Sequence, residues 1–496
     1  MLRNSLYNLA GGTVRLGLGI ISVPLLIKIV GIEQYGIYSL ASSLISIAAL
    51  SEWSIALTVT VFVAESLNNC LDTKESKENQ KAALVVVVLL SLATVCLLGF
   101  VSFLLPFFFG RLNYENIRQM QVCCQVGAVL VGIRLFQQFF IGLLQAHQQY
   151  GLSNSLSTGF TITLTTSTLL TAWYYERLLP IFCVQVLVSL LFLLIYAWVS
   201  TQYRFLDKTL WSSALKRDLI RRQAIYSFRT WTGTFGGVLF THGDKLIVGK
   251  LLGAELVGTY SALTSITTQI NQLSSLPLQP IIPEISHFQS NISSENSSYI
   301  KKVNKKKILY AYKLNVYLAT FIGIMIIGLS PEILTFLSLS ESLLELKSNL
   351  ILLSAIYTLY SFNALGYFIL LALKKTKIFL RIQMIGGFST LIAIGLLSTL
   401  YPYSLTGAIL GNSLYCITYA FVWYAARSLL ISPNTFIKYT IFPVLTICIL
   451  AYSSHQIHEQ YTRISIVFLI CFFVGWRLLR NFSKYRIERL PLVLHE

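Results

Sequence analysis

The chain has 496 residues, of which 55% are hydrophobic and only 12% charged, and its formal net charge is +18. With a mean hydropathy of +0.67, this composition is too apolar for a soluble globular domain, which would aggregate. Helices of about 20 apolar residues joined by short loops leave room for roughly a dozen or more membrane spans. The composition therefore predicts an all-α, polytopic membrane protein.

Fourteen apolar segments follow one another along the chain, and each is long enough for a transmembrane helix. They are residues 8–30, 37–63, 82–106, 121–146, 155–175, 179–200, 224–250, 255–282, 311–330, 349–373, 382–401, 405–427, 438–454 and 463–479. No small-residue cleavage site follows the first, so we interpret it as a span and not as a removable signal peptide. An even number of spans places both termini on one side.

Lysine and arginine gather in alternate loops, and this bias indicates the orientation, because basic loops are retained in the cytoplasm. With a cytoplasmic amino terminus, the inside loops hold the basic clusters at 74–81, 204–222, 301–307, 374–381 and 480–489. The outside loops hold only Arg111, Arg118, Arg177, Lys250 and Lys347. Both termini are therefore predicted to be cytoplasmic, and most of the net charge is a topology signal, not a nucleic-acid footprint.

Polar connections divide the spans into groups. The basic segment 203–223 is predicted to be a cytoplasmic linker between an amino-terminal six-helix lobe, 1–202, and a carboxy-terminal six-helix lobe, 224–427. An additional helix pair over 438–480 and a cytoplasmic tail, 481–496, follow. A second polar, lysine-rich segment, 283–310, lies inside the second lobe.

A short motif occurs twice. The segment from Lys28 to Ser39 reappears from Lys250 to Ser261, at a constant offset of 222 residues. The positions that match in type are Lys28, Gly31, Glu33, Gly36, Tyr38 and Ser39, with Lys250, Gly253, Glu255, Gly258, Tyr260 and Ser261. An even number of spans intervenes, so the two halves are predicted to be parallel repeats related by an axis along the membrane normal.

Polar stripes keep the same register in both copies. In the first span the stripe is Asn8, Gly12, Arg15, Gly19 and Ser22; in the seventh it is Thr230, Thr234, Gly237, Thr241 and Asp244. Ser39, Ser43 and Ser46 of the second span are answered by Ser261, Ser265 and Thr268 of the eighth. Such faces on apolar helices are predicted to contact a hydrated cleft or another helix, and the small residues alone are equally explained by close packing.

Charged residues inside the spans are candidate functional groups, since each costs about 2.5–3.5 kcal/mol at the bilayer centre. Arg134 lies near the middle of the fourth span, with Gln138 one turn further on the same face. It either lines a substrate pathway or bonds structurally to carbonyls or to Gln138. Arg15 can snorkel toward the cytoplasm, and Arg229 lies close to the start of its span. Together with Asn8, these residues are predicted to line a cationic, substrate-binding cavity.

Asp244 and Lys245 form a second candidate set, near the outer end of the seventh span. Asp244 could bind a coupling proton or sodium ion, or neutralise Arg15 or Arg134. Lys245 points about 100° away and is expected to pair with another helix. Converging cations suit an anionic ligand such as a lipid diphosphate, because desolvated arginine binds phosphate bidentately. A carboxylate substrate would satisfy the same arrangement.

Two stretches carry a family resemblance: Leu25 to Ala41 and Gly243 to Tyr260 resemble the corresponding segments of Wzx-type polysaccharide flippases, in the multidrug/oligosaccharidyl-lipid/polysaccharide exporter superfamily. The resemblance implies a V-shaped pair of six-helix lobes, alternating access, and export of undecaprenyl-diphosphate-linked oligosaccharide from the cytoplasmic to the outer face. It implies a role in O-antigen (lipopolysaccharide), capsule or exopolysaccharide biosynthesis in a bacterial inner membrane. The implied partners are that substrate, membrane lipids and other polysaccharide-assembly membrane proteins.

The resemblance also assigns residues. It implies that Arg15 and Arg134 hold the head group and that the two last spans form a groove for the prenyl tail. One departure concerns the second span, where the family shows an acidic-glycine turn followed by a basic residue and this chain has Ser51-Glu52-Trp53-Ser54. The resemblance therefore assigns no cationic residue to that span.

Other classes fit the sequence less well. The eight cysteines and six histidines are dispersed, without Cys-x-x-Cys pairs or metal-ligand spacing, so neither a metal nor another cofactor is expected. The outer loops are short for a sugar-polymerising enzyme, and Gly249-Lys250 is followed by Leu251, so there is no phosphate-binding loop. A cation-coupled multidrug antiporter of the same superfamily is the main alternative, but it would use acidic membrane residues, and basic ones predominate here.

Overall fold

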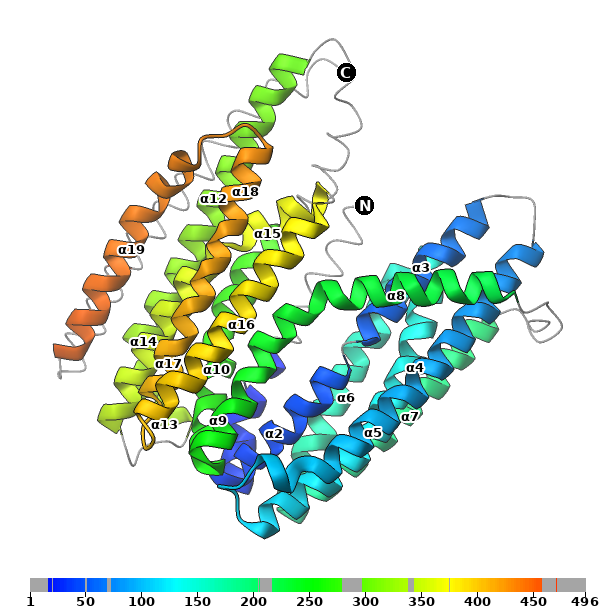
Figure 1. Ribbon diagram of the computed structural model, residues 1–496, viewed down its shortest axis with the longest axis horizontal. Helices are drawn as coiled ribbons and strands as arrows, with labels where there is room; N and C mark the ends of the chain where they lie inside the picture. Colours follow the sequence, from blue (N-terminus) through cyan, green and yellow to red (C-terminus); the bar gives the residue numbers. More distant parts are fainter. Residues whose placement is uncertain are drawn as a thin grey trace. The chain divides into compact units, whose positions relative to one another are not determined.

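The computed structural model is helical throughout the part that it describes, with no strand in that part (Figure 1). It describes residues 17–19, 21–49, 51–68, 73–203, 205, 216–278, 297–337, 343–373, 375–456 and 470. Seven helices in these ranges are long and apolar enough to cross a bilayer. The chain is therefore a multi-pass membrane protein, and the full count of fourteen spans stays a prediction.

Most predicted spans are single helices. These are α4 (Thr73–Phe108), α5 (Tyr114–Ala146), α6 (Tyr150–Tyr175), α7 (Leu178–Gln202), α10 (Ala254–Ser275), α12 (Ser297–Gly328), α16 (Thr376–Leu400) and α19 (Pro433–Gln456). The predicted span 155–175 is thus confirmed as helical within α6. Residues 21–30 are helical at the end of the first predicted span, and the last predicted span, 463–479, lies outside the described residues apart from 470.

Four predicted spans are interrupted. The second is divided into α2 (Ile32–Ala48) and α3 (Ser51–Asn68), and the tenth into α14 (Leu343–Ser361) and α15 (Ala364–Ala372). The seventh runs through α8 (Arg217–Val238), a π-helical turn η2 (Leu239–Gly243) and α9 (Asp244–Leu252); the twelfth through α17 (Thr406–Asn412), a 3₁₀ segment η4 (Ser413–Tyr419) and α18 (Ala420–Ser428). The short element η3 (Leu276–Leu278) lies near the end of the eighth predicted span, 255–282, and α13 (Ser330–Phe336) begins at the last residue of the ninth, 311–330. Interrupted helices leave backbone groups to be satisfied by neighbours, so they belong where protein surrounds them or a cavity is lined.

The chain divides into two compact units. The first comprises Met1–Ala262 with Ile394–Ser404, and the second Leu263–Ala393 with Leu405–Glu496. In the first unit, α5 is central and packs against α2, α3, α4 and α7, while α6 packs on α7. Helix α8 crosses α3 and α4 and packs on both (Figure 1). The seventh predicted span, 224–250, therefore belongs to the same unit as the first six.

The second unit is built on α12, which packs against α14 and α19, and on the pair α15 and α18. Gly366 of α15 touches the backbone of α18, where a Cβ would lie 2.7 Å from the Cα of Val422. Buried polar side chains join these helices at several points. Asn315 donates to the Ser361 carbonyl over 2.9 Å, and Asn363 donates to Thr418 Oγ1 over 2.6 Å. The unit is thus held by close backbone packing and by interhelical hydrogen bonds together.

Candidate functional site

The repeated motif forms two equivalent turns. Gly31 precedes α2 with φ 81°, and Gly253 separates α9 from α10 with φ 95°. Residues with side chains rarely adopt this left-handed region, so the motif needs glycine at its first glycine position in both copies. Each turn then opens a helix with an acid in its first turn, Glu33 in α2 and Glu255 in α10, where the helix dipole favours negative charge.

The two copies also pack against each other, in a contact that we term the glycine seam: Ile32, Gly36, Ser39, Ala254, Gly258 and Ser261. A Cβ on Gly36 would clash with the Ala254 carbonyl and lie 3.1 Å from the Gly258 nitrogen. A Cβ on Gly258 would press on the Ile32 carbonyl and lie 3.1 Å from the Gly36 nitrogen. The two contacts are equivalent, because adding or subtracting the repeat offset of 222 converts the residues of one into those of the other. The two hairpins are therefore related by a two-fold axis.

A buried hydrogen bond continues the glycine seam one turn further. Ser39 Oγ donates to Ser261 Oγ over 2.7 Å, and the two residues are again repeat equivalents. Both serines are buried, at 7% and 1% exposure. For these two positions the predicted polar stripe therefore faces another helix, not water.

Asp244 is buried at the start of α9, directly after the π-helical turn. Its Oδ2 accepts a hydrogen bond from the Tyr260 hydroxyl over 2.8 Å, and its Oδ1 accepts one from the Lys245 backbone N–H, also over 2.8 Å. Lys245 is half-buried and interacts with Asp244 electrostatically. The described partners of the carboxylate are therefore a tyrosine of the repeat motif and its own helix; Arg134 is not among them.

Arg134 lies midway along α5, half-buried, and its guanidinium carbon is 5.9 Å from the centroid of the Phe160 ring on α6. Its Nε is buried without a hydrogen-bond acceptor in the described part of the chain. Gln138, one turn along α5, is half-buried and makes no side-chain hydrogen bond there. A cation over an aromatic ring with an unused buried donor is suited to an anionic ligand.

An acid that sequence reasoning did not select belongs to this cluster. Glu52 lies in the first turn of α3, just after the interruption that divides the second span, and interacts electrostatically with Arg134. Its Oε1 is buried without a donor in the described part of the chain. The available signal was a lone acid inside an apolar segment, 37–63, at the position where the family pattern departs. The cluster of Glu52, Arg134, Gln138 and Phe160 is hereafter the α3–α5 polar cluster.

The other predicted cavity residues are placed differently. Arg229 is exposed on α8. Asn8 and Arg15 lie outside the described residues. Arg134 and Gln138 thus lie one turn apart on α5, Arg229 lies on α8, and a shared substrate cavity stays a prediction.

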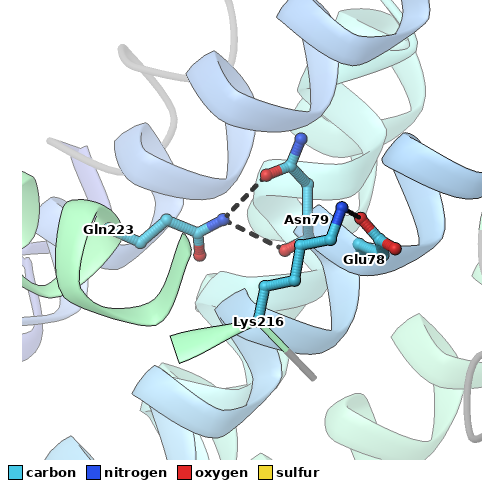
Figure 2. A network of polar contacts seen from close by, with 4 residues as sticks. All are labelled: Glu78, Asn79, Lys216 and Gln223. Atoms are coloured by element: carbon cyan, nitrogen blue, oxygen red, sulfur yellow. Dashed lines mark hydrogen bonds and ion pairs between the residues drawn. The ribbon is translucent and has the colours of Figure 1, made fainter. Parts of the chain in front are cut away.

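Helix α8 is fastened to α4 by a buried polar network at one end (Figure 2). Lys216 Nζ is 2.6 Å from Glu78 Oε2, and the Glu78 side chain is only 2% exposed. The Gln223 amide donates to the backbone carbonyl of Asn79 over 3.1 Å and to its side-chain oxygen over 3.4 Å. Sequence reasoning missed this network, because Glu78 and Asn79 appeared only as part of a polar loop.

Metal-ligand geometry is not a feature of the described residues, among which no three His, Cys, Asp or Glu side chains gather. The candidate chemistry is therefore that of the α3–α5 polar cluster and of the carboxylate at Asp244. Both are suited to binding charge inside the membrane.

The family model described as "Polysaccharide biosynthesis protein" matches residues 1–289. No curated protein matches the chain. Among solved structures, the lipid II flippase MurJ in an inward closed conformation is similar at a TM-score of 0.72 and 14% identity, covering 98% of this chain and 100% of that one. An inward-facing multidrug resistance MATE family transporter of the MOP superfamily is similar at a TM-score of 0.63 and 12% identity, covering 84% of this chain and 98% of that one. A MOP superfamily transporter from Pyrococcus furiosus is similar at a TM-score of 0.50 and 16% identity, covering 86% of this chain and 92% of that one. At these identities the likeness shows the fold.

Proposed function

The chain belongs to the polysaccharide biosynthesis protein family, and from this premise we propose that it is a flippase that translocates undecaprenyl-diphosphate-linked oligosaccharide from the cytoplasmic to the outer face of a bacterial inner membrane. The proposal includes alternating access between six-helix lobes at 1–202 and 224–427, with both termini cytoplasmic. The fold shared with the lipid II flippase MurJ supports a lipid-linked cargo. We assign the product to O-antigen, capsule or exopolysaccharide.

One observation carries the proposal: Arg134 keeps a buried, unused donor midway along a membrane helix. A buried N–H donor without an acceptor is costly, so binding of an anion to this nitrogen is favourable. A diphosphate can accept two parallel N–H bonds from the planar guanidinium, and Phe160 on its other side holds the group in place. Arg134 is thus the residue that we expect to bind the head group.

Glu52 has a complementary role in this proposal. Glu52 interacts electrostatically with Arg134, and an acid beside the arginine lowers the cost of holding the cation inside the bilayer when no ligand is bound. An arriving diphosphate competes with Glu52 for Arg134. Because the carboxylate then repels the diphosphate, the ligand dissociates more easily than it would from an isolated arginine. A transporter needs this, since it must also release its substrate.

The glycine seam supports alternating access. It joins the two copies of the repeat through backbone contact and one serine pair. Contacts of this kind contain no ion pair and no large interlocked side chain, so they can separate at modest cost and re-form in register. We propose that opening and re-forming of the seam is part of the alternating-access movement.

The test uses a strain in which the gene is deleted and then restored as a variant. We expect deletion to leave a lipid-linked saccharide on the cytoplasmic leaflet, and the intact gene to clear it. Arg134→Ala should fail to clear it while the protein stays folded and inserted. Arg118→Ala is the matched control, since Arg118 is on the same helix but exposed near its start. Full clearance by Arg134→Ala would remove Arg134 from the mechanism, and no accumulation on deletion would refute the function.

The alternative is a cation-coupled antiporter, favoured by the buried carboxylate of Asp244. An acid that binds a cationic drug needs free oxygens, whereas both oxygens of Asp244 already accept hydrogen bonds from Tyr260 and Lys245. We therefore propose that Asp244 stabilises the outer hairpin and does not bind cargo. Drug efflux that depends on Asp244, with no lipid-linked saccharide accumulating on deletion, would favour the antiporter.

A further inference from the structure

A hydrocarbon-lined groove of about 510 Å³ lies in the first unit, between α2, α3, α4 and α8. Its volume is in the range of ligand sites, about 300–1,000 Å³. Apolar side chains of α4 form one wall, among them Leu90, Leu97 and Val101, and α8 supplies an aromatic wall. Leu97 and Phe228 are 60% and 64% exposed, so the groove opens to the surface.

The hydroxyls in this groove offer little to a polar ligand. Ser227 shares a hydrogen bond of 2.8 Å with Thr58. Thr94 donates to the carbonyl of Leu90 over 2.7 Å. Trp231 stacks on Phe228 at 5.6 Å and packs on Phe235 at 5.1 Å between ring centroids. A surface of this chemistry takes a hydrocarbon chain and offers little to a sugar.

The same face of α8 ends in arginines. Residues 217, 221, 224, 228, 231 and 235 follow one another at spacings of 4, 3, 4, 3 and 4, which keeps them on one side of a helix. The first two are Arg217 and Arg221, both exposed, and neither has an ion-pair or hydrogen-bond partner in the described part of the chain. Asp218 lies beside Arg217 on the chain, about 100° around the helix, and Lys216 is already paired with Glu78.

We propose that this groove binds one acyl chain of an anionic membrane phospholipid, whose phosphate lies on Arg217 and Arg221. The predicted topology places the arginines at the cytoplasmic surface, where anionic phospholipids supply negative charge. The charge at one end and the hydrocarbon at the other match a single phospholipid along one helix face. The bound lipid would support α8 against α3 and α4, whichever cargo the protein carries.

The test measures quenching of Trp231 by phospholipids with brominated acyl chains, in vesicles that hold the full-length protein. The Trp231 component is the difference between wild type and Trp231→Phe. Brominated phosphatidylglycerol should quench it with about thirty-fold higher apparent affinity than brominated phosphatidylcholine, from about 1 kcal/mol for each arginine. Equal quenching by both lipids, or none, would overturn the proposal.

Matched variants separate the head-group contact from the groove. Arg217→Gln/Arg221→Gln should lose the preference for phosphatidylglycerol, and Arg222→Gln, an exposed arginine one position around the helix, should keep it. Ala93→Phe should block the groove that Ala93 lines, while Leu92→Phe, on the outward face, should not. If Arg222→Gln lost the preference for phosphatidylglycerol to the same extent, the preference would depend on net charge alone, and the proposed site would be overturned.

A separate arm identifies the native occupant. Lipids extracted from purified wild-type protein and from Ala93→Phe are compared by mass spectrometry, with an acidic phospholipid expected to be depleted in the variant. A polyprenyl diphosphate depleted in its place would overturn the proposal and make the groove part of the cargo path. That outcome would leave the proposed flippase function standing, whereas the phospholipid result does not depend on it.

Discussion

Replacing Gly36 by alanine should separate the glycine seam. The new Cβ would press on the Ala254 carbonyl oxygen, lie 2.9 Å from its carbonyl carbon and 3.1 Å from the Gly258 nitrogen. All three atoms belong to the backbone, so no side chain can rotate away and the helices themselves must move. Overpacking of this kind costs about 1–3 kcal/mol, and the rigid partner places Gly36→Ala near the upper end.

The control is Gly99→Ala in α4, where nothing lies within 4 Å of the added Cβ. Both glycines are helical, so both variants gain the same helix propensity, roughly 0.5–1 kcal/mol, and the difference between them isolates the steric cost. Thermal unfolding of the purified variants, followed by intrinsic fluorescence, should give Gly36→Ala the lower midpoint by a few degrees. Equal midpoints would refute the backbone contact.

The double variant sharpens the test. Gly258→Ala makes the same contact from the other side, against the Ile32 carbonyl. Once the helices have moved apart for one methyl group, the second fits at little extra cost, so the two changes should be less than additive. Full additivity would show that the two glycines do not share one interface.

Three further predictions concern single side chains. Tyr260→Phe removes the hydroxyl that donates to the buried Asp244, so it should cost about 1.5–3 kcal/mol of unfolding free energy, more than Tyr38→Phe at the repeat-equivalent position; equal costs would contradict the pairing. Asp244→Asn should leave any dependence of transport on an ion gradient unchanged, and its loss would make Asp244 a coupling site. Burial lowers the pKa of His147 in the folded protein below 6.5, so the folded protein loses stability as the pH falls through the pKa that this residue has in the unfolded chain. His147→Phe keeps the stacking on Phe205 and should therefore reduce the loss of melting temperature between pH 7 and 5. An unchanged dependence of the melting temperature on pH would exclude His147 as its cause.

Apolar length was sufficient to predict the helical architecture of the described residues. The segments 121–146 and 179–200 lie within α5 and α7, because a run of apolar residues without water to bond must satisfy its backbone internally. The repeat was equally readable. Gly31 and Gly253 recur because both turns need a left-handed residue, and Gly36 and Gly258 because two backbones meet.

The interruptions and the pairings could not be read in the same way. The pattern of the apolar run 37–63 does not predict the break at Ala49. The polar residues that lead to Asp244 keep ordinary helical spacing, so they do not predict the π-helical turn there. Periodicity records which face of a helix is apolar but not which helix lies beside it. Glu52 and Arg134 are 82 positions apart in sequence, and only the packing of α3 on α5 relates them.

The central claim is that this protein moves a lipid-linked saccharide across a bilayer. The direct measurement places purified protein in vesicles that carry a labelled undecaprenyl-diphosphate-linked oligosaccharide and follows how much label stays accessible to an impermeant reagent outside. The account predicts that intact protein equilibrates the label across both leaflets and that Arg134→Ala, equally folded, does not. Label distribution that is the same with and without the protein would contradict the account.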